Sequence, residues 1–363
     1  MQVKLESQKV VRPKELLLIA KHCLIHNFPL LIKGRLGTGK TQICFQAALE
    51  AGFKPENIVI ESPHMKEITD YVGLPFAFYD AEKNRQKADF LPINTLEKML
   101  ESKEPMVFIF DELDKAKLTM NAVAQIICQR EISGRKIPDY IRFIATCNLP
   151  EEETGGGAIK PHLLDRFFSV VELKPSVEDW AEYILKKYGI NAIVLVSFVR
   201  FRPQYILDGQ NTELALSIEK TPTARTLENF LKILLSVKEC EERKTIEPLL
   251  AGVAGDEFYI EFKAFSELFH SSLPTFEEIA TSPHEALIPT RDKDIILRHA
   301  IVGMLSSRVN EDTFVGCVKY LLRAEWNSFA SLRRVFLEQV KILKPQLLDN
   351  HNFVPYILRL ITE

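Results

Sequence analysis

Residues 34–41 read GRLGTGKT and follow directly on an apolar run, PLLIK, at 29–33. They match the pattern G-x-x-x-x-G-K-[ST] at every required position. A helical pattern follows at 42–51, so the segment has the order strand, glycine-rich loop, helix. In this setting the pattern predicts that residues 34–41, called the phosphate loop below, bind the phosphates of a nucleotide.

Each part of the phosphate loop has a physical purpose. Glycines let the backbone curl so that several N–H groups point at one anion, and the N-terminus of the next helix favours negative charge. The lysine adds a positive charge near the β- and γ-phosphates, and the last hydroxyl is a ligand for Mg²⁺. The residues predicted to hold the nucleotide are Gly34, Gly37, Thr38, Gly39, Lys40 and Thr41.

A second apolar run, MVFIF at 106–110, ends in the adjacent carboxylates Asp111 and Glu112. Carboxylate oxygens at the end of a strand suit Mg²⁺, so Asp111 is predicted to hold the metal together with Thr41. A hydrolytic site also needs a group that orients or deprotonates water, and Glu112 is predicted to be that group. Asp114 is a weaker candidate, and it is equally suited to cap the next helix.

Short apolar runs alternate with helical patterns through the first half of the chain. Consecutive apolar positions are typical of strands that are buried on both faces of a parallel sheet. The predicted strands are 29–33, 57–61, 106–110, 140–146 and 168–173. After residue 175 the apolar residues repeat with the period of a helix, as at 177–188, 225–238, 258–269 and 295–305. The sequence therefore predicts an α/β core with a parallel sheet, followed by an all-helical region, and one flexible glycine-rich stretch at 154–157.

Composition limits the classes of function. The 363 residues carry a net charge of −3, which gives no overall basic field for nucleic acid. Residues 1–9 are polar and do not form the apolar core of a signal peptide, and no apolar stretch approaches the ~20 residues of a membrane span. The six scattered cysteines indicate reduced, mostly buried thiols, so we expect a cytoplasmic protein with no membrane span. His22 and His26 have helical spacing but no third ligand, so no metal site is predicted there.

From about residue 13 to about residue 270 the chain resembles the AAA+ ATPases, and within them the MoxR family of bacterial and phage type. The segment YIRFIATCN at 140–148 resembles the strand that ends in the sensor-1 polar residue, which maps to Asn148. An amide there would hold the attacking water or touch the γ-phosphate. The segment LLDRF at 163–167 resembles the arginine-finger segment, in which Arg166 would reach the γ-phosphate bound by the neighbouring subunit.

A third segment, TPTART at 221–226, resembles the sensor-2 segment at the start of a lid helix. Arg225 would then bend back onto the bound nucleotide. The proline and the aromatic residue that usually flank this arginine are replaced by Ala224 and Leu227. A surface arginine that interacts with the end of its helix is the alternative for Arg225, and a surface ion pair with Asp165 is the alternative for Arg166.

The resemblance implies a chain of three parts: an AAA+ nucleotide-binding core at 1–174, a helical lid at 175–248 and a helical C-terminal region at 249–363. It implies hydrolysis of ATP with Mg²⁺, with Glu112, Asn148, Arg166 and Arg225 as the catalytic residues. It also implies a homo-oligomer, most often a hexameric ring, that remodels or activates a protein target as a chaperone does. The implied partner is a protein of the von Willebrand factor A type.

Two further segments resemble inserts of this family that face a substrate or a partner. A hairpin is predicted at 76–92, and a second one at 131–139 with a turn at Ser133 and Gly134. Plain surface loops are the alternative. A nucleic-acid-directed motor, of the restriction or helicase-loading type, is the second interpretation of the chain, and an ATP-gated binding module is the third. The charges of the first hairpin nearly cancel, which favours a protein target, and the presence of Glu112 favours hydrolysis over binding alone. No N-K-x-D motif for guanine is present, so ATP is the expected nucleotide.

Overall fold

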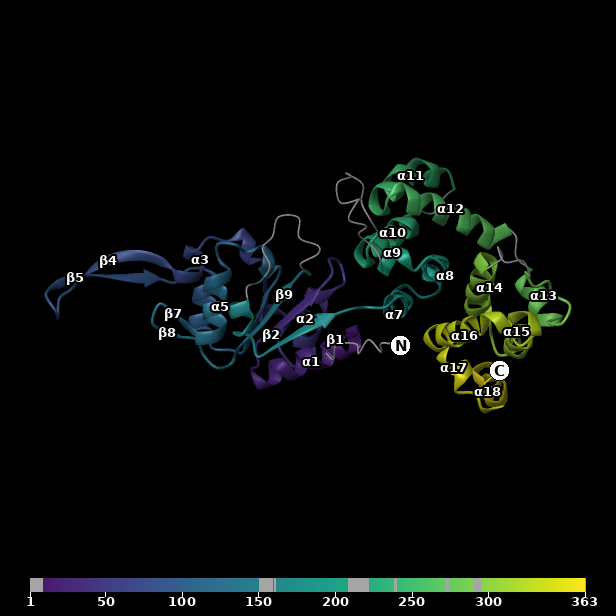
Figure 1. Cartoon of the computed structure of the whole chain (residues 1–363), viewed down its shortest axis with the longest axis horizontal. Helices are drawn as coiled ribbons and strands as arrows, with labels where there is room; N and C mark the ends of the chain where they lie inside the picture. Colours follow the sequence, from purple (N-terminus) through teal and green to yellow (C-terminus); the bar gives the residue numbers. More distant parts are fainter. Residues whose placement is uncertain are drawn as a thin grey trace, which may run out of the picture. The chain divides into compact units, whose positions relative to one another are not determined.

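The computed structural model describes residues 9–149, 159, 161–207, 222–237, 240–271, 274–289 and 295–362, and the predicted flexible stretch at 154–157 lies outside them. The chain divides into two compact units, Met1–Pro175 and Ser176–Glu363, which are drawn in Figure 1 and described separately here. The expected boundary between lid and C-terminal region at residue 248 falls within a helix of the second unit and stays a prediction.

A six-stranded sheet forms the centre of the first unit, in the order β1-β10-β2-β9-β6-β3. All neighbouring strands are parallel. The strands are β1 (Val10–Val11), β2 (Leu30–Gly34), β3 (Ile58–Glu61), β6 (Met106–Phe110), β9 (Ile141–Cys147) and β10 (Ser169–Leu173). The five predicted strands and the parallel sheet are confirmed; the short edge strand β1 was not predicted. The α/β core with a parallel sheet and a following helical region is thus the fold of this chain.

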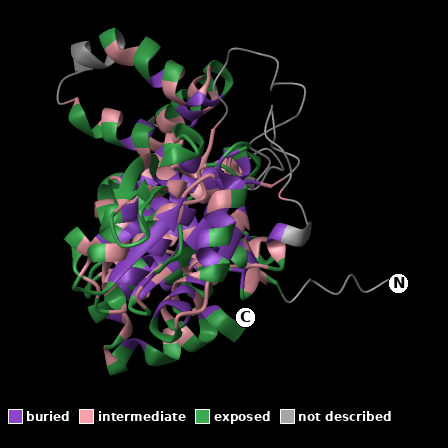
Figure 2. Ribbon diagram, turned by 90° about the vertical axis from the view of Figure 1, so that its left-hand side faces the viewer, coloured by how far each residue is buried: buried purple, intermediate pink, exposed green. Residues whose placement is uncertain are grey.

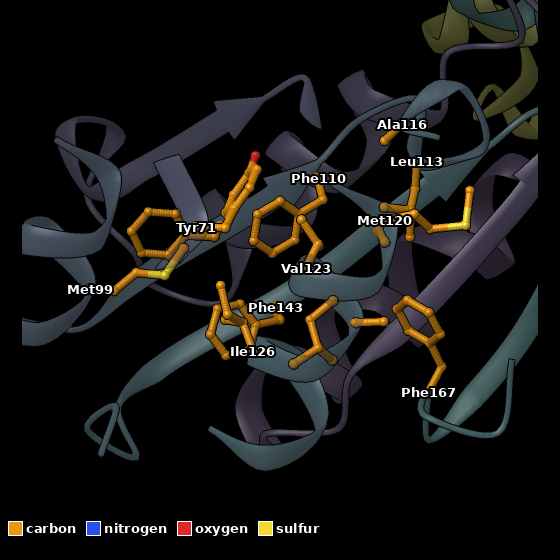
Figure 3. Packing of buried hydrophobic residues seen from close by; sticks show 14 of the residues in the cluster. Tyr71, Met99, Phe110, Leu113, Ala116, Met120, Val123, Ile126, Phe143 and Phe167 are labelled. Atoms are coloured by element: carbon orange, nitrogen blue, oxygen red, sulfur yellow. The ribbon is translucent and has the colours of Figure 1, made fainter. Parts of the chain in front are cut away.

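Helices cover both faces of this sheet because alternate residues of each strand point to opposite sides. On β6, Val107 and Ile109 share an apolar cluster with α1 (Pro13–His26) and α2 (Lys40–Glu50). Phe108 and Phe110 share the other cluster with α4 (Thr95–Glu101) and α5 (Met120–Gln129). Figure 3 shows this second cluster, with the rings of Phe110 and Phe143 against side chains of α5, and Figure 2 shows the central strands as buried.

Both predicted hairpins are present in the first unit. β4 (Leu74–Asp80) pairs with β5 (Arg85–Leu91) after the short helix α3 (Thr69–Val72), and this largely exposed hairpin reaches beyond the other elements (Figure 1). β7 (Glu131–Ile132) pairs with β8 (Arg135–Lys136) after α5. Ser133 and Gly134 form its turn with φ of 47° and 81°, the positive φ values that a favoured type of two-residue hairpin turn requires at both positions.

The second unit is helical throughout its described residues. Its helices are α7 (Val177–Tyr188), α8 (Ile193–Phe201), α9 (Gln204–Leu207), α10 (Ala224–Ser236), α11 (Cys240–Ala254), α12 (Asp256–Ser271), α13 (Phe276–Thr281), α14 (Ile295–Arg308), α15 (Phe314–Leu321), α16 (Ala330–Leu343), α17 (Pro345–Leu348) and α18 (Val354–Thr362). One apolar core gathers around Phe198, Phe230 and Phe258, and another gathers around Phe314 and Phe336. None of the helices in the described part of the chain has the length and apolar character needed to cross a membrane.

Candidate nucleotide site

The phosphate loop leaves the carboxyl end of β2 and turns directly into α2. Gly37 and Gly39 have φ of 73° and 87°, the left-handed region in which successive N–H groups turn towards one side and form a concave anion site. Gly34 allows a close approach, because a Cβ atom there would lie 3.0 Å from the carbonyl oxygen of Leu173 on β10. The loop therefore has the backbone shape that phosphate binding needs.

Lys40 begins α2 and is 8% exposed. Its Nζ donates hydrogen bonds to the carbonyl oxygens of Gly34 at 2.6 Å and Arg35 at 2.9 Å, and to Asn148 Oδ1 at 3.1 Å. A buried ammonium group needs such acceptors, because burial without partners costs several kcal/mol. The lysine is thus held inside the loop by groups that phosphate oxygens can replace.

Asn148 follows β9 and is bound to Asp114, which lies in a 3₁₀ turn (Leu113–Lys115) after β6. The backbone N–H of Asn148 donates to Asp114 Oδ1 at 3.0 Å, and its side-chain Nδ2 donates to Asp114 Oδ2 at 3.2 Å. Asp114 is 2% exposed. The expectation that Asp114 caps the following helix is wrong: the N-cap of α5 is Thr119, and the Asp114 carboxylate is directed at Asn148 instead.

Thr146, on β9, contacts both of the adjacent acidic residues, Asp111 and Glu112. Its hydroxyl donates to Asp111 Oδ1 and accepts the backbone N–H of Glu112 at 3.3 Å. The backbone N–H of Asp111 donates to the carbonyl oxygen of Glu61 on β3 at 2.8 Å. The residues after β6 are therefore fixed from both neighbouring strands, which sets where the Asp111 and Glu112 side chains can point.

Glu112 is the first residue after Asp111 and has φ of 54° and ψ of 45°, a left-handed conformation that is uncommon for glutamate. Such backbone positions persist where the surroundings hold them, and they cluster at functional sites. The Glu112 carboxylate lies 2.8 Å from Lys115 Nζ and 3.7 Å from His64 Nε2. The candidate general base is thus partly exposed and is held by two basic side chains.

Besides Asp114, a second carboxylate is buried near the site, that of Glu61 at the end of β3. The Tyr71 hydroxyl donates to Glu61 Oε1 at 3.0 Å, while Glu61 Oε2 is buried without a hydrogen-bond partner among the described residues. Burial raises the pKa of the Tyr71 hydroxyl, and the negative charge of Glu61 raises it further, so this hydroxyl stays a donor. Tyr71 belongs to α3 at the base of the β4–β5 hairpin, and Figure 3 shows its ring beside Phe110.

The side chains present suit Mg²⁺. Thr41, in the first turn of α2, is half-buried, and its hydroxyl makes no hydrogen bond within the described chain. Asp111 Oδ2 is not engaged by Thr146, which binds only the other oxygen. Mg²⁺ is usually bound through one or two protein oxygens, with waters and substrate phosphates completing an octahedron. A hydroxyl and a carboxylate beside a phosphate-binding loop fit this requirement, and no larger set of carboxylates is needed.

The two predicted arginines belong to different units of the chain. Arg166 follows the short helix α6 (Pro161–Leu164), is half-buried, and forms no ion pair with Asp165 or with any other residue that the structure describes. Arg225 is exposed in the first turn of α10, in the second unit. Thr223 caps that helix, and an arginine in a first turn is opposed by the helix dipole, so capping does not explain Arg225.

The structure thus brings Lys40, Asn148, Asp111 and Glu112 together at the carboxyl edge of the sheet, after β2, β9 and β6. None of the contacts at this edge among the described residues involves Arg166, and Arg225 belongs to the second unit, which is described separately. The sequence motifs predict no role for Thr146 or Lys115, and the predicted role of Asp114 as a helix cap is wrong. A hydroxyl residue near the end of an otherwise apolar strand was the available signal for Thr146.

We predict that Thr146→Val, which preserves shape but removes the hydroxyl, lowers ATP turnover about 5-fold to 30-fold. The loss of the hydrogen bond frees Asp111 Oδ1 and leaves the Glu112 N–H without its acceptor. Turnover measured across a Mg²⁺ titration checks this, and the half-saturating Mg²⁺ concentration should rise. Unchanged turnover and Mg²⁺ dependence would show that Thr146 only fills space.

No protein-family model and no curated protein sequence matches the chain. Among solved structures it is similar to NtrX from Brucella abortus in complex with ATP, with 17% identity and a TM-score of 0.33, over 60% of this chain and 49% of that one. For NtrX in complex with ADP the identity is 14% and the TM-score 0.38, over 91% and 68%. For a lysine-to-arginine mutant of RuvB from Thermotoga maritima the identity is 18% and the TM-score 0.39, over 71% and 75%. This chain thus spans about half the length of the first of these structures.

The class of protein is defined by the chain's own geometry and not by these likenesses. A glycine-rich loop lies between a central parallel strand and a helix, and its buried lysine meets an asparagine from the next strand. Together with the carboxylates after β6, these features define a P-loop α/β fold.

Proposed function

We propose that this protein is an AAA+ ATPase of the MoxR type, which hydrolyses ATP in a ring of identical subunits to remodel or activate a protein target. The convergence of three strand ends carries the proposal. Lys40, the Asp111–Glu112 pair and Asn148 follow three neighbouring strands of one sheet, and Lys40 Nζ lies 3.1 Å from Asn148 Oδ1. Ligands of open α/β sheets bind at the carboxyl ends of the strands, where these groups lie.

The residues divide the chemistry between them. The phosphate loop and Lys40 bind and orient the phosphates, with Thr41 and Asp111 as the ligands for Mg²⁺. Bound Mg²⁺ would neutralise charge that develops on the phosphate oxygens. Glu112 accepts a proton from the attacking water, and Asn148 helps to orient that water. Hydrolysis is favoured over binding alone because Glu112 is partly exposed and within reach of this edge.

Arg166 supports a role for a neighbouring subunit. Ser169 at the start of β10 pairs with Leu30, and Leu173 at its end pairs with Gly34, so the strand separates its two ends by about 13 Å. Arg166 lies before the start of β10, while the phosphates bind beyond its end. This separation favours a contact of Arg166 with the γ-phosphate of a second subunit over one with its own phosphate loop.

Two different exposed apolar surfaces also fit an assembly of identical subunits. One lies beside Glu112 and includes Met65 and Leu118, which are 76% and 69% exposed. The other follows Arg166 and includes Phe168, which is 67% exposed and stacks on Phe28 at 4.1 Å. Contact between two different patches of the same protein is head-to-tail, and such contacts produce rings when the rotation closes. A hexamer is the expected ring.

The helical unit would supply the lid. Arg225 has no ion pair with any described residue, and its position at a helix start gives it no local stabilising role. We propose that it contacts the nucleotide from the lid, so that hydrolysis changes the angle between core and lid and moves neighbouring subunits.

The β4–β5 hairpin is proposed to contact the target. An isolated two-stranded hairpin is marginal in water, and this one exposes Phe78 and Tyr79. Lys87 is paired with Asp80 at 2.7 Å, and the remaining acidic and basic side chains balance, which favours a protein surface over nucleic acid. A protein of the von Willebrand factor A type is the proposed partner.

Specific ATPase activity measured against protein concentration tests the proposal, with Glu112→Gln as the background. We expect activity per subunit to rise with concentration as rings form, and single-stranded DNA to have no effect. If activity per subunit stays constant down to nanomolar protein and size-exclusion chromatography shows a monomer, the proposal that activity requires a ring is wrong. Stimulation by DNA would instead favour a nucleic-acid motor.

A further inference from the structure

We infer that Asp114 is a positioning residue for hydrolysis: it fixes the side-chain amide of Asn148 so that the oxygen, and not the nitrogen, faces Lys40. This inference rests on the proposed ATPase activity for its kinetic consequences. Asp114 does not reach the reacting atoms itself but acts through Asn148.

The orientation of the Asn148 amide follows from donor and acceptor chemistry. An ionised carboxylate only accepts hydrogen bonds and an ammonium group only donates them, whereas an amide offers one of each kind of end. Asp114 Oδ2 therefore accepts a hydrogen bond from Asn148 Nδ2 at 3.2 Å, and Lys40 Nζ donates one to Asn148 Oδ1 at 3.1 Å. The reverse orientation would set donor against donor at Lys40 and acceptor against acceptor at Asp114.

Burial makes this arrangement obligatory. Asp114, Asn148 and Lys40 are 2%, 9% and 8% exposed, so water cannot readily replace a missing partner. Both Asp114 oxygens are used by Asn148, one by its backbone N–H and one by its side chain. This double contact holds the Asn148 side chain in one rotamer as well as one orientation, because backbone and amide are fixed by the same carboxylate.

The consequence for catalysis lies in what Asn148 presents at the nucleotide. When phosphate oxygens accept the hydrogen bonds of Lys40, Asn148 Oδ1 loses its donor and becomes a free acceptor beside the phosphates. An acceptor can hold a hydrogen of the attacking water and so direct the water's lone pair, which an NH₂ group in the same place cannot do.

The isosteric variant Asp114→Asn removes the acceptor that holds the Asn148 amide in this orientation. The amide oxygen introduced at position 114 still accepts the backbone N–H of residue 148, but the introduced NH₂ group now faces Asn148 Nδ2. A half-turn of the Asn148 amide relieves this donor–donor contact but turns its NH₂ group towards Lys40, so the amide is no longer fixed in one orientation. We expect kcat to fall about 10-fold to 100-fold, as for outer partners that orient a metal ligand, with the Kd of a fluorescent ATP analogue changed less than about 3-fold.

The exchange variant D114N/N148D provides the decisive comparison. Here the residue at 114 donates from its NH₂ group to the new carboxylate at 148, which again presents an oxygen to Lys40. The total charge and the side-chain sizes are those of the natural protein. We expect the acylation rate of Lys40 to fall back to the natural value or below, because Lys40 again faces an acceptor, whereas the carboxylate at 148 repels the phosphates and lowers turnover. The control is Asp139→Asn, because the Asp139 side chain is 97% exposed and lies outside the site.

The experiment measures kcat, KM and thermal unfolding for the four proteins, and the acylation rate of Lys40 by an amine reagent with mass spectrometry. Lys40 should react about 2-fold to 5-fold faster in Asp114→Asn, and the exchange variant should reverse this. Equal Lys40 reactivity in all four proteins, or a kcat of Asp114→Asn equal to that of Asp139→Asn, would overturn the inference. A folded exchange variant in which Lys40 reacts as fast as in Asp114→Asn would also overturn it.

Failure of the proposed function has a different signature. If the natural protein neither binds nor hydrolyses ATP, the ATPase proposal fails, while the Lys40 reactivity still decides the role of Asp114. If Asp114→Asn alone does not fold, the exchange variant and the natural protein still give both readouts.

Discussion

Replacing Glu112 with glutamine is expected to lower the rate of ATP hydrolysis by about two to four orders of magnitude, the range that a positioned general base contributes. Glutamine has the same shape but cannot accept the proton of the attacking water. Nucleotide binding should persist, because Lys40 and the phosphate loop are unchanged. The ion pair with Lys115 is also lost, but a partly exposed pair of this kind contributes little to folding.

Single-turnover hydrolysis and binding of a fluorescent ATP analogue measure the two effects separately. The matched control is Glu56→Gln, an exposed glutamate in a 3₁₀ turn (Pro55–Asn57) away from the site. A Glu112→Gln variant that hydrolyses ATP within about 10-fold of the natural rate would be incompatible with Glu112 as the base, on the scale of effects expected for general base catalysis. Loss of binding together with hydrolysis would point to a structural role for Glu112 instead.

Replacing Arg166 with alanine is expected to reduce turnover by about three orders of magnitude, the lower end of the effect of an arginine finger. The reason is the loss of a positive charge next to the γ-phosphate in the transition state. Each subunit should still bind ATP, because Lys40 and the phosphate loop are unchanged. The control is Arg308→Ala, an exposed arginine at the end of α14 in the helical unit.

Mixing two inactive variants tests whether Arg166 acts between subunits. A subunit with Arg166→Ala keeps its own Lys40 and Glu112, and a subunit with Glu112→Gln keeps its Arg166. In a ring that contains both at equal amounts, about one site in four has an intact Glu112 opposite an intact Arg166, so about one quarter of the natural activity should return. Absence of any recovery, with mixed rings confirmed by native mass spectrometry, would contradict the role in trans.

Local patterns were enough to predict most of the fold. Each buried strand is a short apolar run, and the strands lie within a residue or two of their predicted ranges because such runs are bounded by loops and helical patterns. The helix α7 begins and ends at its predicted residues. Its start is fixed locally, because Ser176 and Asp179 form a capping box. The short strand β1 was missed because two apolar residues carry no period, and only pairing with β10 makes them a strand.

The candidate site was predictable only in part. The phosphate loop and the Asp111–Glu112 pair were recognised because each is one continuous segment whose chemistry is set by its own residues. Thr146 and Asp114 carry no such pattern. Their roles depend on the neighbours that a folded sheet gives them, and a threonine in a strand or an aspartate in a turn has many ordinary explanations.

Residue patterns alone establish a glycine-rich loop between a strand and a helix, acidic residues after a second strand, and a helical second half. The contacts of Asn148 with Asp114, 34 residues earlier, and with Lys40, 108 residues earlier, exist only in the folded chain. The order of the parallel strands places β9 between β2 and β6. Asn148, after β9, can therefore reach Lys40 after β2 and Asp114 after β6, because hydrogen bonds join only groups about 3 Å apart.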